Sequence, residues 1–252
     1  MNSIINKIFL LSTFVLFIVI FGSCERNFQP KIIMAELIEV KVTEHSQKNE
    51  ISQWLSPYKD SLDKIMNIKI GHSAQEMEAG RTGSLLGSFV TEVMKDYAKN
   101  HRKEVDFAIT NIGGLRKSLP QGEITIGDVY KMFPFDNELV ILTLPGKKVE
   151  QLCQEIAKQG GQVTNGIKIL IEDSVAKEIR IGEIPLDTNR NYKVLTTDYL
   201  SFGNDNLFAL KDYTGIYSFK APLREIIIDY IKNEHEKGRM INAEVSNQIL
   251  IK

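Results

Sequence analysis

Three short segments of this 252-residue chain end in turns that carry polar or aromatic side chains. Residues 109–116 read ITNIGGLR, residues 133–137 read FPFDN, and residues 198–205 read DYLSFGND. The first and third each predict a strand that runs directly into a glycine-containing turn, where a missing side chain lets a ligand approach the backbone. Flat rings, a carboxylate, an amide and a guanidinium on such turns suit a nucleotide, which offers a base, sugar hydroxyls and phosphate.

The same segments resemble the C-terminal domain of the 5'-nucleotidases, a family that includes periplasmic UDP-sugar hydrolases and 2',3'-cyclic-nucleotide phosphodiesterases. The resemblance covers roughly Glu36 to the C-terminus and rests on three motifs in order: TNIGGLR, then GEITIGDVYKMFPFDNELVILTLPGKKVEQL, then YKVLTTDYLSFGND. Ordered motifs of this length are more specific than a single short pattern. The resemblance implies a binding domain over residues 35–252.

Two aromatic residues are the expected contacts for the base. The family clamps the base between one ring from the Pro-Phe turn and another ring six residues before the Asp of the last motif. In this sequence these positions are Phe135 and Tyr199. Tyrosine replaces the commoner phenylalanine, but its ring keeps a face for stacking. The alternative is that both rings belong to the hydrophobic core.

Asp205 is the expected partner of the sugar. The resemblance implies that its carboxylate accepts hydrogen bonds from both ribose hydroxyls. Asn204 stands where the family usually has glycine, so it must tolerate a backbone conformation that glycine adopts freely. The alternative for Asp205 is a purely local role, because Asn and Asp often stabilise turns by bonding to their own backbone.

The turn at Gly113 and Gly114 is flanked by Asn111 and Arg116. The resemblance implies that Asn111 and Arg116 reach the sugar-phosphate side of the ligand. Independently, an arginine just past a Gly-Gly turn is placed at the end of a strand rather than on a helix face. The alternative for Arg116 is a surface salt bridge.

Arg81 is the second candidate for a phosphate contact. It precedes the segment TGSLLG at 82–87, where the family often carries an arginine and then a glutamate before a helix. The glutamate is absent here, because Gly83 occupies that region. We therefore expect Arg81 to act as a second cation near the phosphate, without its usual acidic companion.

The elements that must position these residues follow from hydrophobic periodicity. Apolar residues at helical spacing predict helices at 51–66, 84–100, 126–132, 149–158 and 222–236. Alternating or β-branched runs predict strands at 37–43, 68–71, 106–110, 138–144, 168–172, 178–181, 192–196 and 249–251. Helices and strands intermingle, with hairpin-like pairs in the second half. We therefore expect an α/β (α+β) fold, a layered sandwich with a mixed sheet rather than a doubly wound parallel sheet.

The front of the chain predicts export. Residues 4–22 are largely apolar, and their core of about 14 residues is short for a helix that spans a bilayer. The run ends in FGSC at 21–24, which resembles a bacterial lipobox. We expect residues 1–24 to be a signal peptide ending at a lipidated Cys24, residues 25–34 to be a tether, and the protein to be anchored to a bacterial membrane on its periplasmic or cell-surface side. The alternative, an uncleaved anchor helix, also places the rest outside the cytoplasm.

Charge and cysteine content narrow the possible partners. The chain has 31 Lys and Arg against 32 Asp and Glu, a net charge of −1. A chain with almost no net charge has no overall positive potential to attract nucleic acid, so we expect no nucleic-acid partner. Cys153 lies in an apolar stripe with Val149, Leu152 and Ile156. A buried free thiol is expected there rather than a disulfide or a nucleophile.

The metal centre of the family has no counterpart in this sequence. In 5'-nucleotidases a separate N-terminal domain holds two metal ions through Asp, His and Asn. Here there is no Asp-x-His near the start, no Gly-Asn-His-Glu and no room for such a domain before Ala35; the four histidines are His45, His72, His101 and His235. We therefore expect no catalytic residue, no cofactor and no metal on this chain, with divalent metals only on a partner phosphoesterase.

Two other segments look like metal ligands. Residues 233–236, NEHE, predict a solvated helix end, and Gly127-Asp128 predicts the start of a short helix where a carboxylate meets free N–H groups. Neither is expected to bind a metal.

Two functions therefore remain open. The first is an exported nucleotide-binding domain that completes the active site of a separately encoded metallophosphoesterase in nucleotide hydrolysis, and that is inactive alone. The alternative is a lipoprotein that binds nucleotides or nucleosides without any hydrolytic role. A third possibility, a structural lipoprotein with a decayed pocket, is disfavoured by the retained Phe135, Tyr199, Asp205 and Arg116.

Overall fold

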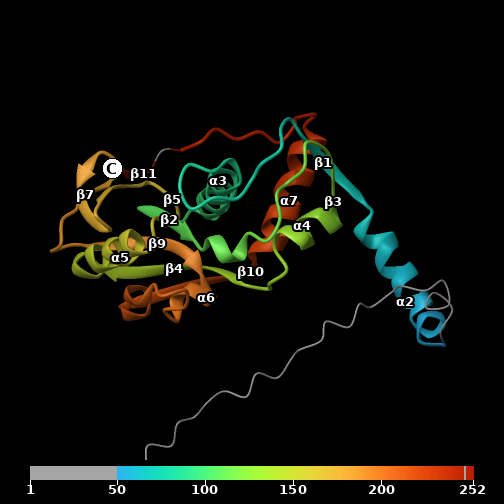
Figure 1. Ribbon diagram of the computed structural model, residues 1–252, viewed down its shortest axis with the longest axis horizontal. Coiled ribbons are helices and arrows are strands. Elements are labelled where there is room, and N and C mark those ends of the chain that lie inside the picture. Colours follow the sequence, from blue (N-terminus) through green and yellow to red (C-terminus); the bar gives the residue numbers. More distant parts are fainter. Residues whose placement is uncertain (1–49, 247) are drawn as a thin grey trace, which may run out of the picture. The chain divides into compact units, whose positions relative to one another are not determined.

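A computed structural model describes residues 50–246 and 248–252 of the chain (Figure 1). The predicted signal segment with Cys24, the tether at 25–34 and the strand at 37–43 lie outside the described residues. Within the described part, no helix is both long enough and apolar enough to cross a membrane.

Helices and strands intermingle along the chain. The α-helices are α2 (Glu50–Met66), α3 (Leu85–Asn100), α4 (Ile126–Met132), α5 (Gly146–Lys158), α6 (Asp198–Ser201) and α7 (Leu223–Glu236), and the 3-10 turns are η2 (Ile112–Gly114) and η3 (Phe208–Asp212). The strands are β1 (Lys69–Ser73), β2 (Phe107–Thr110), β3 (Gly122–Thr125), β4 (Glu138–Pro145), β5 (Val163–Asn165), β6 (Ile167–Glu172), β7 (Val175–Ile181), β8 (Ile184–Pro185), β9 (Asn191–Thr197), β10 (Gly215–Pro222) and β11 (Ile249–Ile251).

The central sheet has five strands in the order β10-β4-β9-β2-β5. It is mixed, because β2 runs parallel to β9 whereas β4 is antiparallel to both β9 and β10. A second sheet has the order β11-β6-β7-β8, with β11 parallel to β6, and β1 pairs with β3. The predicted α/β sandwich with a mixed sheet is confirmed.

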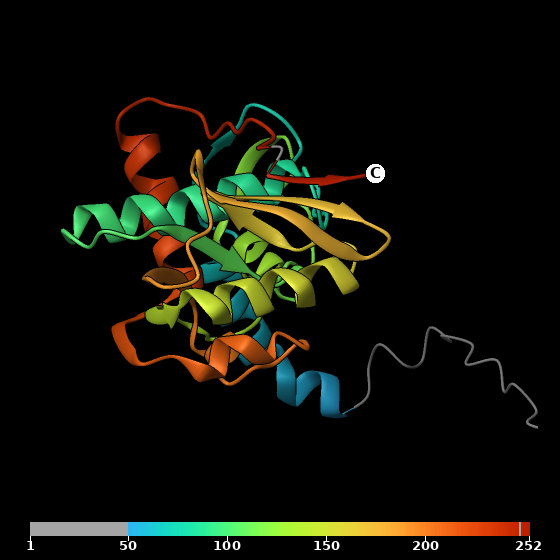
Figure 2. The ribbon, with the colours of Figure 1, turned by 90° about the vertical axis from the view of Figure 1, so that its left-hand side faces the viewer.

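Side chains of the central sheet alternate between two hydrophobic clusters, as the two-residue period of a strand requires. On β2, Ala108 faces one cluster, whereas Phe107 and Ile109 face the other. The first cluster contains buried residues of α3, α4 and α7, and the second those of α5, β6 and β7. Figure 2 shows the green helix α3 and the yellow-green helix α5 on opposite sides of the sheet. Residues 50–252 thus form one compact unit with its own core.

Cys153 lies on α5 in the second cluster and is a free, fully buried thiol. Burial away from water disfavours the thiolate, so the pKa of Cys153 is raised far above its ordinary value. The prediction of a buried free thiol at this position is confirmed.

The segment at 198–205 differs from the prediction of a strand that leads into a turn. Strand β9 ends at Thr197, and residues 198–201 form the short helix α6. The Thr197 hydroxyl caps this helix by accepting a hydrogen bond from the amide of Leu200 at 3.4 Å. Strand β9 therefore contains the strand predicted at 192–196, but the residues that follow it are helical, and Tyr199 lies on a helical turn.

Helix α5 also differs, since it begins at Gly146 directly after β4. Pro145 ends the strand and occupies the N-cap, so the Pro-Gly pair starts a helix instead of separating two elements by a loop. Strands β3, β5, β8 and β10 were not predicted. They are short or half-exposed, so their side chains do not show the regular alternation that identifies a strand.

Candidate functional site

The candidate site lies where two neighbouring parallel strands end. Strands β2 and β9 pair in parallel through Phe107–Val194 and Ala108–Leu195. Their carboxyl ends therefore meet at the same edge of the sheet, and the turn that follows each strand emerges there. This topology brings the segment at Asn111 beside the segment at Asp205, although 94 residues separate them in sequence.

Asp205 is the centre of a small hydrogen-bond network at this edge. Its Oδ2 accepts a hydrogen bond from Nδ2 of Asn111 at 2.6 Å, and its Oδ1 accepts one from the Tyr199 hydroxyl at 2.8 Å. The bond to Asp205 raises the pKa of Tyr199, with burial as a smaller cause. Tyr199 thus remains a protonated donor at neutral pH. A carboxylate has about four lone-pair sites, so Asp205 can still accept from ligand hydroxyls.

The turn that presents Asp205 is built from left-handed backbone. Gly203, Asp205 and Asn206 have φ values of 79°, 54° and 57°. Asn204 is not among the left-handed residues, so replacing the family's glycine with Asn204 does not impose the predicted strain. Instead, its Nδ2 donates to the carbonyl of Tyr199 at 2.7 Å and closes the turn. The asparagine is compatible with the loop because its side chain bonds locally.

The glycine turn after β2 leaves room beside Asp205. A Cβ at Gly113 would lie 3.5 Å from Oδ2 of Asp205, and a Cβ at Gly114 would lie 3.0 Å from Oδ1 of Asn111. The second distance is tight, so a side chain at Gly114 would press on the amide that holds Asp205. The buried Gln162, which the sequence did not indicate, accepts from the amide of Ile112 at 2.8 Å and fixes this turn from behind.

Phe135 lies just before β4 and Tyr199 just after the neighbouring strand β9, and Asp198 links these two strand ends. The Oδ1 of Asp198 accepts from the amide of Tyr199 at 2.7 Å and from the amide of Glu138, the first residue of β4, at 3.0 Å. Phe135 is 48% exposed and Tyr199 is 36% exposed. Neither ring is a core residue, which excludes the alternative raised by the sequence. Both remain accessible to a ligand.

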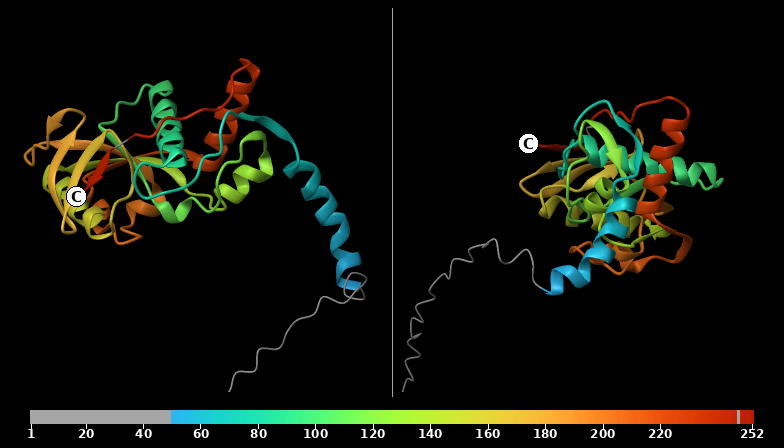
Figure 3. Two further views of the ribbon diagram at one scale, coloured as in Figure 1. Left: turned by 45° about the horizontal axis from the view of Figure 1, so that its top comes forward. Right: turned by 90° about the vertical axis from the view of Figure 1, so that its right-hand side faces the viewer.

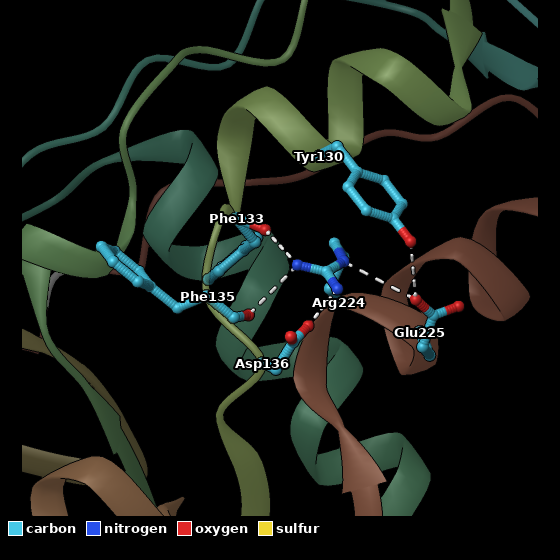
Figure 4. Close-up of polar contacts among 6 residues, drawn as sticks. All are labelled: Tyr130, Phe133, Phe135, Asp136, Arg224 and Glu225. Carbon is cyan, nitrogen blue, oxygen red and sulfur yellow. Dashed lines mark hydrogen bonds and ion pairs between the residues drawn. The ribbon is translucent and has the colours of Figure 1, made fainter. Parts of the chain in front are cut away.

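Arg224, at the start of α7, holds the turn that carries Phe135 (Figure 4). Its guanidinium donates to the carbonyls of Phe133 at 3.2 Å and Phe135 at 3.4 Å, and it pairs with Asp136. The Arg224 side chain is only 8% exposed, whereas Asp136 is 77% exposed. The buried guanidinium thus bonds two backbone carbonyls of this turn through Nη1, while its buried Nε has no hydrogen-bond partner in the described part of the chain.

A second group of contacts orients the same guanidinium. Cζ of Arg224 lies 4.0 Å from the centroid of the Tyr130 ring, and its Nε lies 3.6 Å from Oε1 of Glu225. The Tyr130 hydroxyl donates to that same oxygen at 3.4 Å. Arg224 was not predicted as a functional residue, because an arginine 89 residues from Phe135 gives no local signal.

The two predicted phosphate contacts are exposed. Arg116 is exposed, its backbone amide donates to the carbonyl of Met132 at 2.9 Å, and its side chain has no ion-pair partner in the described part of the chain. The loop of Arg81 packs against Gly161, whose neighbour Gln162 fixes the glycine turn. No hydrogen bond among the described residues links Arg81 or Arg116 to Asp205.

The two segments that resemble metal ligands have structural roles. Asp128 forms a capping box with Thr125 at the start of α4. Glu234 pairs with Arg239 and Lys237 at the end of α7, and the bond to Arg239 lowers its pKa to about 2. Within residues 50–246 and 248–252, no group of three or more His, Cys, Asp and Glu side chains is arranged to hold a metal ion.

Comparison with known proteins matches this fold and site to one family. The sequence profile described as "5'-nucleotidase, C-terminal domain" matches residues 69–212, which include every predicted binding residue. The chain is 30% identical over 213 residues to the cell wall protein Lmo0130 of Listeria monocytogenes, covering 74% of this chain and 27% of that protein. It is 25% identical over 195 residues to a 5'-nucleotidase of Vibrio cholerae, covering 75% and 35%.

Solved structures show the same fold. A 5'-nucleotidase precursor from Thermus thermophilus superposes with a TM-score of 0.69 at 24% identity, over 79% of this chain and 42% of that one. The chain spans less than half the length of each of these relatives. Since the family profile matches more than half of the sequence and carries the motifs of the site, the chain belongs to the family of the 5'-nucleotidase C-terminal domain.

Proposed function

We propose that this chain binds nucleotides or nucleosides as the substrate-binding domain of a 5'-nucleotidase-type hydrolase. The observation that supports this most directly is the Asp205 carboxylate, held by Asn111 and Tyr199 beside an open glycine turn. Tyr199, whose hydroxyl bonds this carboxylate, and Phe135 are both partly exposed and supply two aromatic faces for stacking. Relatives of the chain carry the name 5'-nucleotidase, which supports a nucleotide as the ligand class.

Each group of the site has a role in this proposal. The rings of Phe135 and Tyr199 stack on the base. Asp205 accepts hydrogen bonds from the ribose hydroxyls on the lone pairs that Asn111 and Tyr199 leave free. Gly113 keeps that space open, and Arg116 and Arg81 are assigned to the phosphate side as exposed cations.

Replacing Asp205 with Asn tests the sugar contact. Asparagine tolerates the left-handed φ of 54° at this position, so the turn is kept while the charge is removed. Hydrogen bonds to charged groups contribute roughly 1.5–3 kcal/mol, so Asp205→Asn should weaken adenosine binding roughly 10- to 150-fold. Binding of 2',3'-dideoxyadenosine should be unchanged, since that sugar has no hydroxyls for the carboxylate.

Calorimetric titration of AMP, adenosine and dideoxyadenosine provides the measurement. The proposed binding function is wrong if the folded wild type binds neither AMP nor adenosine at millimolar concentration. The assignment of Asp205 is wrong if Asp205→Asn weakens all three ligands equally.

We further propose that the divalent metals of the reaction belong to a separately encoded metallophosphoesterase. Two-metal hydrolysis needs a cluster of Asp, His and Asn ligands around ions about 4 Å apart, and the described residues offer none. This chain would supply no catalytic group. It would position the substrate, by holding the scissile phosphate over the partner's metals. Phosphate release from AMP by a metal-loaded phosphoesterase chain should rise when this chain is added. Equal release with and without it contradicts the proposal and favours a binding lipoprotein with no hydrolytic role.

Export and membrane anchoring are part of the same proposal and rest on residues 1–24 of the sequence. The FGSC segment after a short apolar run supports lipidation of Cys24. Metabolic labelling with a fatty-acid analogue should mark the wild type and not Cys24→Ser. Equal labelling of both would exclude this anchor.

A further inference from the structure

The hydroxyl of Tyr199 joins the two halves of the proposed site. The ring of this residue is assigned to the base, and its hydroxyl donates to Oδ1 of Asp205, the carboxylate assigned to the sugar, at 2.8 Å. A phenylalanine, which the sequence resemblance gives as the commoner residue at this position, has no such donor. The hydroxyl therefore needs an explanation of its own, because a stacking face alone does not require it.

The Asp205 end of this bond is held in place. Asn111, which is only 6% exposed, donates to the other carboxylate oxygen at 2.6 Å. The backbone of the same turn is closed by the amide of Leu207, which donates to the carbonyl of Asn204 at 3.2 Å. A carboxylate that is held through one oxygen offers a fixed acceptor on its other oxygen, and the Tyr199 hydroxyl uses that acceptor.

The Tyr199 end has a fixed backbone and a free ring. Its amide donates to Oδ1 of Asp198 and its carbonyl accepts from Nδ2 of Asn204, both at 2.7 Å. Only the side-chain torsions are then left to place the ring. In both views of Figure 3 the orange segment that contains α6 lies at the rim of the compact unit. Among the described residues, the bond to Asp205 is the only hydrogen bond of this side chain, and no other aromatic ring contacts it.

We propose that the Tyr199 hydroxyl, through its bond to Asp205, orients the ring for the base before a ligand arrives. This inference rests on the proposed nucleotide-binding function and adds a coupling between its base half and its sugar half. Tyr199 is a positioning residue in this role, because its hydroxyl acts on the ligand only through the ring that it orients. A carboxylate acceptor makes the bond stronger than one between neutral groups. A ring that is already ordered loses less conformational freedom when the base binds.

The alternative is that the hydroxyl only stabilises the turn at 198–205. Other bonds close this turn without it, namely the Thr197 cap on the amide of Leu200 and the bond from Asn204 to the carbonyl of Tyr199. Tyr199→Phe should therefore change the midpoint of thermal unfolding by no more than about 2 °C. A merely structural role predicts a fall in this midpoint and no change in affinity for the base.

Titration with 2',3'-dideoxyadenosine tests the coupling, because this ligand carries the base but no hydroxyls for Asp205. Tyr199→Phe should weaken its binding roughly 2- to 12-fold, the range expected for ordering one side chain. Asp205→Gly should weaken it by a similar factor, since glycine tolerates the φ of 54° but removes the acceptor. In a Tyr199→Phe background, Asp205→Gly should have no further effect.

Asp205→Asn is the matched control. It keeps a hydrogen-bonding group opposite Tyr199, because a hydroxyl can accept as well as donate. Its affinity for dideoxyadenosine should equal that of the wild type. Retained binding in Asp205→Asn, together with weaker binding in Asp205→Gly, supports the hydrogen bond as the element that orients the ring.

The pKa of Tyr199 gives a second readout that needs no ligand. The bond to Asp205 raises this pKa, because the carboxylate stabilises the protonated phenol. Subtracting the absorbance titration of Tyr199→Phe from that of the wild type isolates Tyr199 among the eight tyrosines. Its pKa should lie above the ordinary tyrosine value of about 10 and should fall in Asp205→Gly. An ordinary pKa in the wild type overturns the proposal, because the bond is then absent.

Failure of this inference can be told apart from failure of the proposed function. If the wild type binds neither AMP nor adenosine, the proposed function is wrong. If it binds both, but Tyr199→Phe binds dideoxyadenosine as tightly as the wild type, the hydroxyl does not orient the ring and the proposed function stands. Equal weakening by Asp205→Gly with and without the hydroxyl also overturns the inference, since a loosened turn then explains the effect. A wild type that binds adenosine but no dideoxyadenosine overturns it as well, because an oriented ring should bind the base without sugar hydroxyls.

Discussion

Replacing Arg224 with Met should lower the free energy of unfolding by about 2–4 kcal/mol. Hydrogen bonds from a charged donor contribute about 1.5–3 kcal/mol each, and Arg224 makes two of them to the carbonyls of Phe133 and Phe135. Methionine fills similar volume but leaves both acceptors without this donor. For a domain of this size the midpoint of thermal unfolding should fall by roughly 4–16 °C. Chemical denaturation and calorimetry measure both quantities.

Two matched variants separate the contribution of the ion pair with Asp136 from that of the bonds to the two carbonyls. Asp136→Asn removes the ion pair, but the carboxylate is 77% exposed, so it should cost no more than about 1 kcal/mol. Arg224→Lys keeps the charge but replaces the planar fork with a single ammonium, which cannot serve two carbonyls in the same geometry. The free energy of unfolding of Arg224→Lys should lie between those of the wild type and Arg224→Met. A change of less than about 0.5 kcal/mol for Arg224→Met, the range of ordinary surface substitutions, would show that the guanidinium does not hold this turn.

Removing either ring of the proposed base clamp should weaken nucleotide binding by about 5- to 150-fold. Stacking of a base on an aromatic side chain contributes roughly 1–3 kcal/mol in nucleic-acid-binding proteins, and this range converts to that change in affinity. Phe135→Ala and Tyr199→Ala each remove one half-exposed ring. Titration calorimetry with AMP and adenosine measures the effect, which should be equal for both ligands because each carries the same base.

Tyrosine 199 has two functions that conservative variants distinguish. Tyr199→Phe keeps the stacking face and removes only the donor to Asp205. It should bind AMP far better than Tyr199→Ala if stacking dominates. Phe135→Leu keeps an apolar side chain without an aromatic face, and it should lose most of the affinity that Phe135→Ala loses. If Phe135→Leu binds AMP as tightly as the wild type, then Phe135 contributes apolar contact and not stacking.

These two predictions depend on contacts that no local pattern contains. The bond from Asn111 to Asp205 joins residues 94 apart, and the contact from Arg224 to Phe135 joins residues 89 apart. The first contact follows from the strand order, which brings the ends of β2 and β9 together, and the second from the pairing of β10 with β4, which sets Pro222 opposite Glu138. The sequence resemblance pointed to Asn111, Phe135, Tyr199 and Asp205 but not to the residues that hold them: Asp198, Gln162 and Arg224.

Local chemistry determined much of the secondary structure. The helix at 126–132 and the strand at 249–251 were predicted to the residue, because periodicity and capping are properties of neighbouring residues. The helix at 198–201 was not predicted. Its N-cap is Thr197, and this residue can cap a helix only because β9 ends there. Tertiary structure alone decided that the Phe135 and Tyr199 rings stay accessible and that Arg224 is buried. The reason is that burial depends on which distant elements pack together, and a residue's own neighbours in sequence do not specify that.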